Sequence, residues 1–165
     1  MNDDRKIKKE KAFAMLRIVF GFLWLIDAAY KWSPSSISLF VNYLLQGAAG
    51  QGAAVQTWVN FWVVGMRVGL YFFAIVIAIA ETAIALGLIF GVFTQIAMVG
   101  GLAMLLVIWS TAQSFGGAYI PGSMDVGAVV TYVIMFAALW IGKSWRHYSL
   151  DSLVEEKIPF FHWLW

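Results

Sequence analysis

The chain alternates between long apolar segments and short polar breaks, and most of the apolar segments are long enough to cross a membrane. A membrane-spanning helix needs about 20 mostly apolar residues. Four segments meet this length, and we predict them as spans at about 12–31, 67–93, 95–112 and 126–145. The pattern therefore predicts an all-α integral membrane protein, a four-transmembrane-helix bundle that forms one membrane domain over residues 1–165.

The segment between the first two predicted spans, residues 33–64, follows a different pattern. It carries no charged residue, and QGAAGQGAA interrupts it near the middle. Apolar residues recur at helical spacing on both sides of this interruption; they are Ile37, Phe40, Val41, Leu44 and Leu45, then Val55, Trp58, Val59 and Trp62. We predict two short interfacial helices here on the extracytoplasmic side. A fifth span is the alternative, which the glycines and glutamines disfavour.

The positions of Lys and Arg predict the orientation in the membrane. RKIKKEK precedes the first span, and Lys143, Arg146 and Lys157 lie at or after the end of the fourth. The positive-inside rule then places both termini in the cytoplasm, as an even number of spans requires. The cytoplasmic tail covers 146–165, and its last residues, IPFFHWLW, are typical of an aromatic interface anchor.

The start of the chain also has the basic and then apolar order of a signal peptide. Its apolar part is too long for one and holds Arg17 and Asp27, and no small-residue cleavage site is clear. We therefore predict a first span that is retained.

Composition agrees with a membrane protein and excludes several kinds of chemistry. The chain is 62% hydrophobic and 12% charged, whereas a soluble domain carries about 25% charged residues. It has no cysteine, which excludes disulfides, iron–sulfur clusters and thiolate chemistry. A net charge of +2 argues against nucleic-acid binding. Both histidines, His147 and His162, follow the fourth span, so we expect no haem or metal site in this chain.

Five charged residues lie in or at the ends of the predicted spans: Arg17, Asp27, Lys31, Arg67 and Glu81. Charges in a membrane are costly, so they usually face the protein interior and pair. Arg17 is about 8 Å and Glu81 about 15 Å from the same end of the bundle, and we predict that they pair. Asp27 and Lys31 share a helix face, and we predict that they form a second cluster with Arg67 near the other end, where Asp125 could join them.

Two roles for these charges stay open at this point. They fix the register of the helices, or they bind a polar head group such as a quinone carbonyl or relay a proton. A quinone needs a hydrogen-bond donor and an apolar slot, and Arg17, Arg67, Trp109 and Tyr119 are candidate donors. Small residues on the face of Glu81, namely Ala74, Ala78 and Ala85, predict that this face is turned inward toward another helix. The catalytic residues stay unassigned.

The stretch IGKSWRHYSLDSL resembles the cytoplasmic end of DoxX/DoxD-family membrane proteins, and its family-like residues are Gly142, Ser149, Leu150, Asp151 and Leu153. Arg17, Gly21 and Lys31 in the first span and Glu81 in the second follow the same order. The resemblance covers about residues 17–153. Ser149 also has the position of a helix cap, and Asp151 lies near the positive end of the short helix that follows.

The resemblance implies a multi-pass protein of a prokaryotic plasma membrane. Some members are subunits of thiosulfate:quinone oxidoreductase, linked to a terminal quinol oxidase, and others accompany diverse redox systems. It thus implies a subunit of a respiratory quinone-linked oxidoreductase that passes electrons from a sulfur substrate such as thiosulfate to quinone, acting with other membrane subunits. The alternative is a non-catalytic accessory subunit of a larger respiratory or terminal oxidase complex, and a small transporter or channel is a third interpretation.

Overall fold

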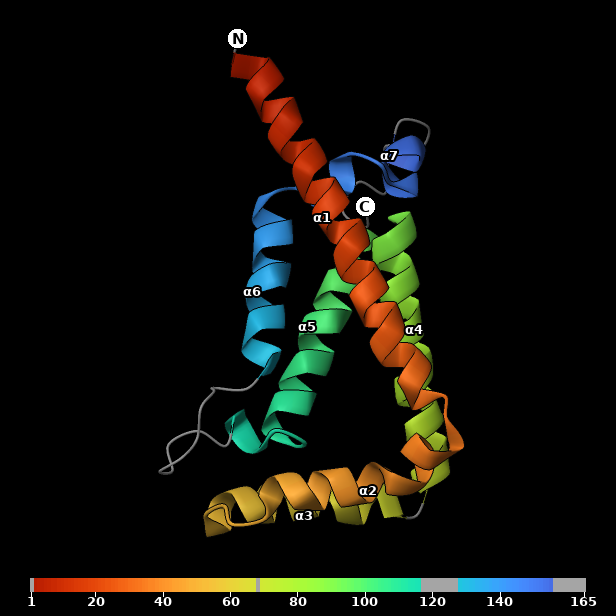
Figure 1. The fold of residues 1–165 in the computed structure, drawn as a ribbon, viewed down its shortest axis with the longest axis vertical. Helices are drawn as coiled ribbons and strands as arrows, with labels where there is room; N and C mark the ends of the chain where they lie inside the picture. Colours follow the sequence, from red (N-terminus) through yellow and green to blue (C-terminus); the bar gives the residue numbers. More distant parts are fainter. Residues whose placement is uncertain (1, 68, 117–127, 156–165) are drawn as a thin grey trace.

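A computed structural model describes residues 2–67, 69–116 and 128–155, and all regular structure in these ranges is helical (Figure 1). In chain order the elements are α1 (Asn2–Lys31), α2 (Pro34–Ala48), α3 (Ala53–Arg67), α4 (Leu70–Phe90), α5 (Thr94–Ser110), the 3₁₀ turn η1 (Ser114–Gly116), α6 (Ala128–Ile141), the 3₁₀ turn η2 (Ser144–Arg146) and α7 (Leu150–Glu155). The predicted all-α class is confirmed for these residues.

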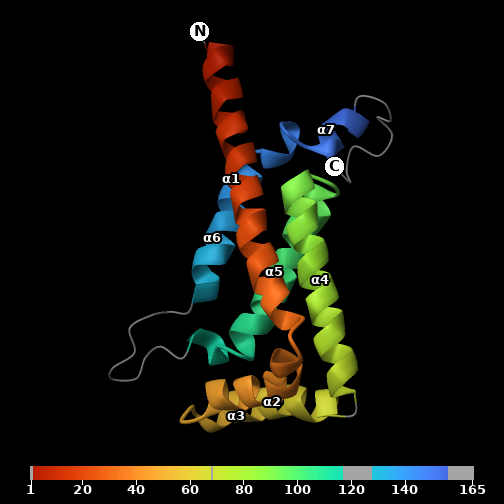
Figure 2. The ribbon, with the colours of Figure 1, turned by 45° about the vertical axis from the view of Figure 1, so that its right-hand side comes forward.

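Helices α1, α4, α5 and α6 pack side by side with alternating direction, and shorter helices cover the two ends of this bundle (Figures 1 and 2). Helices α2 and α3 lie next to each other across one end, which we call the α2–α3 end. Helix α7 and η2 lie at the opposite end, which we call the α7 end. The N-terminal part of α1 projects beyond the bundle at the α7 end (Figure 1).

The helix bounds differ most from the predicted spans at two places. Helix α1 begins at Asn2 rather than near residue 12, because the basic segment continues the helix without a break. The fourth helix stops at Ile141 rather than near residue 145, since Lys143 takes a left-handed conformation (φ 50°) before η2. The predicted roles of Tyr119, Asp125, His162 and the IPFFHWLW segment fall outside the described residues.

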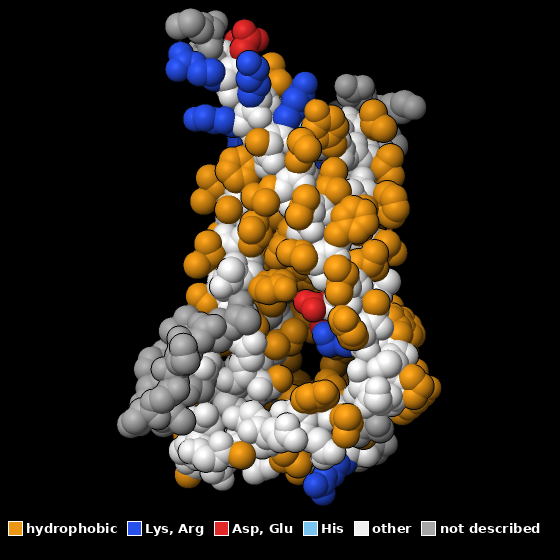
Figure 3. All heavy atoms as spheres, in the orientation of Figure 1, with side chains coloured by type: hydrophobic (Ala, Val, Ile, Leu, Met, Phe, Trp, Pro, Cys, Tyr) orange, Lys and Arg blue, Asp and Glu red, His pale blue; other side chains and the backbone are white. Residues whose placement is uncertain are grey.

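Two helices are long and apolar enough to cross a membrane by length and composition, namely α1 over Asp3–Lys31 and α4 over Leu70–Phe90. Helix α5 and the part of α6 over Val129–Ile141 are apolar but shorter. The face of the bundle that Figure 3 shows is also largely apolar. Large apolar side chains stay exposed on successive turns of one face of α1, at Met15, Val19, Phe22 and Ile26. Such a surface is unusual in a soluble monomer.

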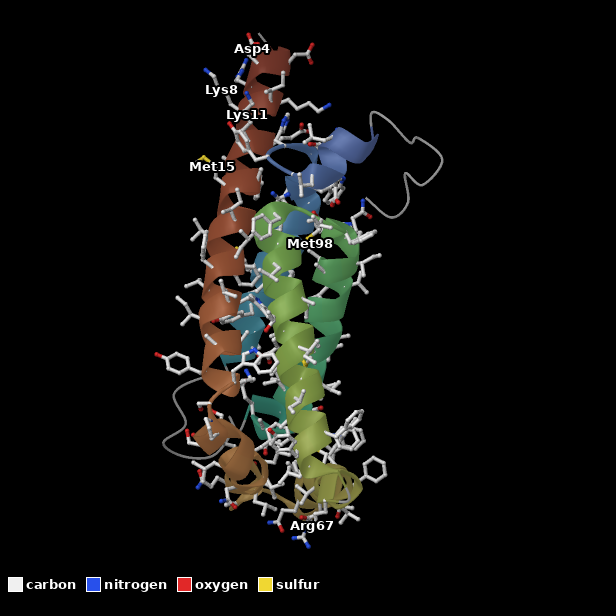
Figure 4. The ribbon with its side chains drawn as sticks, turned by 90° about the vertical axis from the view of Figure 1, so that its right-hand side faces the viewer. Asp4, Lys8, Lys11, Met15, Arg67 and Met98 are labelled. Atoms are coloured by element: carbon white, nitrogen blue, oxygen red, sulfur yellow. The ribbon has the colours of Figure 1, made fainter. Side chains whose placement is uncertain are left out.

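The interior of the bundle is built on interlocking aromatic rings. Phe136 of α6 packs edge-on against Phe20 and Trp24 of α1, with ring centroids 5.0 and 5.7 Å apart. A Cβ on Gly101 of α5 would overlap the ring of Phe136, so the glycine sets how closely α5 and α6 approach. Met98, labelled in Figure 4, is fully buried in the same core, whereas Met15 points outward.

The insert between α1 and α4 forms two helices, as predicted, and not one long span. Its first helix begins where the Ser33 hydroxyl accepts a hydrogen bond from Ser36 N (3.2 Å), with Pro34 in the first turn. Gly50, with φ 77°, forms the turn between α2 and α3. The pair has a small core of its own, formed by Leu44, Ala48, Val59, Val63 and Met66.

A glycine fixes the α2–α3 layer to the bundle, and this contact predicts a stability difference. A Cβ on Gly47 of α2 would overlap the carbonyl oxygen of Ala112, after α5, whereas a Cβ on Gly65 of α3 would meet nothing. We expect Gly47→Ala to destabilise the protein by about 1–3 kcal/mol through overpacking. Gly65→Ala is the matched control and should stabilise it by about 0.5–1 kcal/mol. Thermal unfolding of the detergent-solubilised variants measures both, and equal midpoints would contradict the contact.

Candidate functional site

The buried charges occupy two separate places, one at each end of the bundle. At the α7 end, Arg17 is fully buried and donates hydrogen bonds to two backbone carbonyls, Ser144 O (2.9 Å) and Tyr148 O (2.6 Å). These carbonyls belong to the connection between α6 and α7, so the guanidinium ties α1 to that connection. Arg17 was predicted to pair with Glu81, and the structure contradicts this.

Asp151 completes the contact network at the α7 end. Its carboxylate accepts hydrogen bonds from Phe93 N (2.8 Å) and Thr94 N (2.7 Å), the first N–H groups of α5. Its own N–H donates to the carbonyl of Gly91 (2.9 Å). The buried carboxylate therefore caps the start of α5, and its charge favours the guanidinium of Arg17.

The family-like motif at the α7 end is thus explained mainly by structure. Ser149 caps α7, as predicted, because its hydroxyl accepts from Ser152 N (3.1 Å). Asp151 lies in the first turn of α7, as predicted, and its side chain also caps the start of α5, which was not predicted. Gly142 lies so close to the ring of Phe13 that a Cβ would overlap it. Leu150 and Leu153 are exposed.

At the α2–α3 end, Glu81 of α4 forms an ion pair with Lys31 of α1, with Lys31 Nζ 2.6 Å from Glu81 Oε2. The carboxylate is almost completely buried and the ammonium group is partly exposed. The small residues Ala74, Ala78 and Ala85 on the same face of α4 are buried, as predicted. Glu81 therefore faces the interior but has a different partner from the one predicted.

The register of α1 against α4 explains why Arg17 cannot reach Glu81. Gly91 lies against Arg17, and Glu81 is ten residues earlier on α4, which is about 15 Å along the axis. Helical side chains also point toward the N-terminus of their own helix. Arg17 is thereby directed away from Glu81, whereas Lys31 and Glu81, on antiparallel helices, are directed toward each other.

Only part of the predicted second cluster forms. Asp27 is near this end and accepts a hydrogen bond from the hydroxyl of Tyr132 on α6 (Asp27 Oδ2 to Tyr132 Oη, 3.3 Å). Arg67 is exposed at the end of α3 and points away from the bundle (Figure 4), so it does not join Asp27 and Lys31. Arg67 ends α3, which lies across the end of the bundle and therefore farther out than Asp27 and Lys31. The prediction placed Arg67 at the start of a span, at the same depth as these residues.

The polar side chains at the α2–α3 end line one cavity of about 320 Å³. Its lining residues come from α1, α4, α5, α6 and the turn before η1; they are Trp24, Asp27, Lys31, Glu81, Leu105, Ile108, Gln113, Val129 and Tyr132. Figure 3 shows acidic and basic side chains beside an opening between the bundle and the α2–α3 layer. We call this space the polar cavity.

One residue that lines the polar cavity has a donor without a partner within the described chain. Trp24 is buried, and its Nε1–H makes no hydrogen bond there. A buried N–H without a partner costs free energy, so a cavity that contains one favours a ligand with an acceptor oxygen. Gln113 also borders the cavity, and its side-chain oxygen accepts a long hydrogen bond from Val129 N (3.4 Å).

Sequence reasoning missed Trp24, Gln113 and Tyr132 as site residues. One face of α1 carries Trp24, Asp27 and Lys31 at helical spacing. Because Trp24 lies one turn before Asp27 on this face, the sequence could have indicated it as a site residue. Tyr132 and Gln113 gave no such signal, because tertiary packing alone brings them to Asp27 and Val129. The predicted donor Trp109 does not line the cavity.

The arrangement offers hydrogen-bond donors, two carboxyl groups and one amine to a small polar ligand. In the parts of the chain that the structure describes, no group of three or more His, Asp or Glu residues is placed to hold a metal ion. The chain matches no protein-family model, no curated protein and no solved structure. Its function has to be inferred from the site.

Proposed function

We propose that this chain is a multi-pass membrane subunit of a respiratory quinone-linked oxidoreductase, and that its polar cavity binds the head group of a membrane quinone. The observation that carries the proposal is a cavity of about 320 Å³ that is lined by Lys31, by the buried Glu81 with which it pairs, and by Trp24, whose Nε1–H has no partner among the described residues. Small-molecule sites are usually about 300–1,000 Å³, mostly apolar, and contain a few polar groups.

The residues of the polar cavity fit a quinone carbonyl. Trp24 Nε1–H is a free donor among the described residues, and Tyr132 O–H is a second donor that now binds Asp27. Bound quinone supplies two-electron redox chemistry coupled to proton uptake and release. Asp27 and Glu81 can take up and release the protons, and Lys31 pairs with Glu81 when no ligand is present.

The proposed topology has α1, α4, α5 and α6 as four spans of a prokaryotic plasma membrane. Two of them meet the length and apolarity of a span, and the outside of the bundle is apolar. The projecting basic part of α1 then lies in the cytoplasm under the positive-inside rule, with both termini on that side. The polar cavity opens near the extracytoplasmic face, and α2 and α3 lie along that face.

The resemblance to the DoxX/DoxD family supports a sulfur compound such as thiosulfate as the electron donor. In the polar cavity the carboxyl groups of Asp27 and Glu81 outnumber the amine of Lys31, which disfavours an anionic sulfur substrate there. We therefore assign oxidation of the donor to a partner chain and quinone binding to this one.

Quinone binding is tested with two matched tryptophan variants. Trp24→Phe removes the donor in the polar cavity, whereas Trp109→Phe removes a buried indole N–H that also lacks a described partner but lies outside the cavity. We expect Trp24→Phe to raise the Kd of a short-tailed quinone about 5- to 10-fold, which corresponds to the loss of one hydrogen bond. Trp109→Phe should leave the Kd unchanged. Calorimetric titration of the full chain in lipid nanodiscs measures both.

Two results would overturn the proposal. Equal quinone affinity in the parent chain and in both Trp variants, or no saturable binding to the parent, would remove the polar cavity as a quinone site. Circular dichroism and the unfolding midpoint of each variant check that the fold is intact.

A non-catalytic accessory subunit is the second candidate, and a surface groove favours it. The groove runs between α4 and α5, has a volume of about 750 Å³, and includes the small residues Ala83, Gly87, Gly100 and Ala103. Small residues let a second transmembrane helix approach closely. Gentle solubilisation followed by mass spectrometry tests this role. Redox subunits in fixed ratio, together with absent quinone binding to the isolated chain, would favour it over the first candidate.

A further inference from the structure

A second cavity lies at the α7 end, between the projecting part of α1 and the end of α6, and it has a volume of about 550 Å³. We call it the basic cavity, because four of its lining side chains are basic: Arg5, Lys6, Lys9 and Lys143. Figure 3 shows the basic side chains gathered on this projecting part of α1. It is separate from the polar cavity, which lies at the other end of the bundle.

The charge balance of the basic cavity favours an anion. Its two acidic residues are Asp3 and Glu10. Glu10 already binds the guanidinium of Arg146 (Nη1 to Oε1, 3.4 Å) and the ring of His147 (Nε2 to Oε2, 3.2 Å). The negative charge of Glu10 is therefore partly compensated by residues that do not line the cavity. The lysines then make the electrostatic potential inside the cavity positive.

The floor of the basic cavity is apolar and continues onto the outside of the bundle. Phe13 and Ile141 line it next to Gly142. Ile141 is 81% exposed, and Ile134, two turns earlier on α6, is 64% exposed. The site thus has a cationic upper part and an apolar lower part that opens sideways onto the surface of α6.

From this geometry we infer that the basic cavity binds the phosphate of an anionic phospholipid, whose acyl chains lie along Ile141 and Ile134. A free anion would use the lysines but not the exposed apolar floor, whereas an amphipathic anion uses both. Basic pockets between membrane helices on the cytoplasmic side bind anionic lipid head groups in this way. The inference rests on α1 and α6 crossing the membrane and does not depend on quinone binding.

Lys143 gives the basic cavity a wall that does not belong to α1. It follows the end of α6 with φ 50°, a conformation that favours glycine or asparagine. This backbone conformation does not require a lysine, but the Lys143 side chain borders the cavity. A lipid phosphate between Lys143 and the lysines of α1 would link α1 to the end of α6, beside the contact between Phe13 and Gly142.

Matched lysine pairs on the same helix test the inference. Lys6→Gln with Lys9→Gln removes two charges from the basic cavity, whereas Lys8→Gln with Lys11→Gln removes two from exposed positions of α1 that do not line it (Figure 4). The delipidated full chain in detergent is titrated with phosphatidylglycerol and, separately, with phosphatidylcholine of the same chain length. Native mass spectrometry counts the retained lipids.

We expect the parent chain to retain one phosphatidylglycerol under conditions that remove phosphatidylcholine. The first double variant should bind phosphatidylglycerol roughly 10- to 30-fold more weakly, and the second should stay close to the parent. Equal losses in the two double variants, or equal retention of the two lipids, would overturn the site in favour of diffuse surface charge. Displacement of the lipid by an equal concentration of inorganic phosphate would overturn the assignment to a lipid.

Discussion

Replacing Lys31 by Met is expected to destabilise the protein by about 3 kcal/mol, because it leaves the Glu81 carboxylate buried without its counter-ion. The Glu81 side chain is only 2% exposed, and Lys31 Nζ lies 2.6 Å from its Oε2. The value is at the low end of the range for a broken buried pair, since 35% of the Lys31 side chain stays in contact with solvent. Equilibrium unfolding in mixed micelles measures the change.

A double variant separates the cost of the broken pair from the loss of a side chain. Lys31→Met with Glu81→Leu removes both charges, and such replacements are often neutral or stabilising. We expect its stability to lie within about 1 kcal/mol of the parent, while quinone binding is lost. A double variant as unstable as Lys31→Met alone would show that packing and not charge explains the effect.

Replacing Asp151 by Ala is expected to cost about 3 kcal/mol, because two N–H groups at the start of α5 lose a charged acceptor. These are Phe93 N and Thr94 N, and the carboxylate that they contact is 1% exposed. The substitution also leaves the buried Arg17 without its nearby acid. Thermal unfolding and proteolysis of the connection between α4 and α5 measure the effect.

Asp151→Asn serves as the graded control. Its side-chain oxygen can still accept one of the two hydrogen bonds, so we expect about half of the loss. Asp3→Asn, at an exposed position of α1, should change stability by less than about 0.5 kcal/mol. If Asp151→Ala were as mild as Asp3→Asn, the cap of α5 would contribute nothing to stability.

The sequence predicted the helices well, because apolar length and glycine breaks are local signals. The segment at 67–93 contains α4, the segment at 95–112 contains all of α5 except Thr94, and the break at QGAAGQGAA separates α2 from α3. The inward face of α4 was also predicted, since Ala74, Ala78 and Ala85 lie on the side of Glu81. These features depend on residues within one helix.

The charge pairs were predicted less well, because they depend on register between helices. Glu81 was assigned to the interior correctly, but its partner is Lys31 and not Arg17. Depth measured from the span ends ignores the direction of side chains, which turns Arg17 and Glu81 apart. Arg17 instead binds carbonyls of a connection that follows the bundle, and no spacing in the sequence indicates a backbone acceptor.

The contacts of Arg17 also constrain how the chain is assembled during synthesis. Arg17 precedes Ser144, whose carbonyl it binds, by 127 residues. At about 5–20 residues per second, the ribosome needs roughly 6–25 s to make the intervening chain. If α1 inserts as it emerges, as the proposed topology implies, its guanidinium lacks this acceptor for that time. The contact between α1 and the connection after α6 can then form only when the end of the bundle has been synthesised. A nascent chain stalled before residue 144 would have Arg17 without this contact.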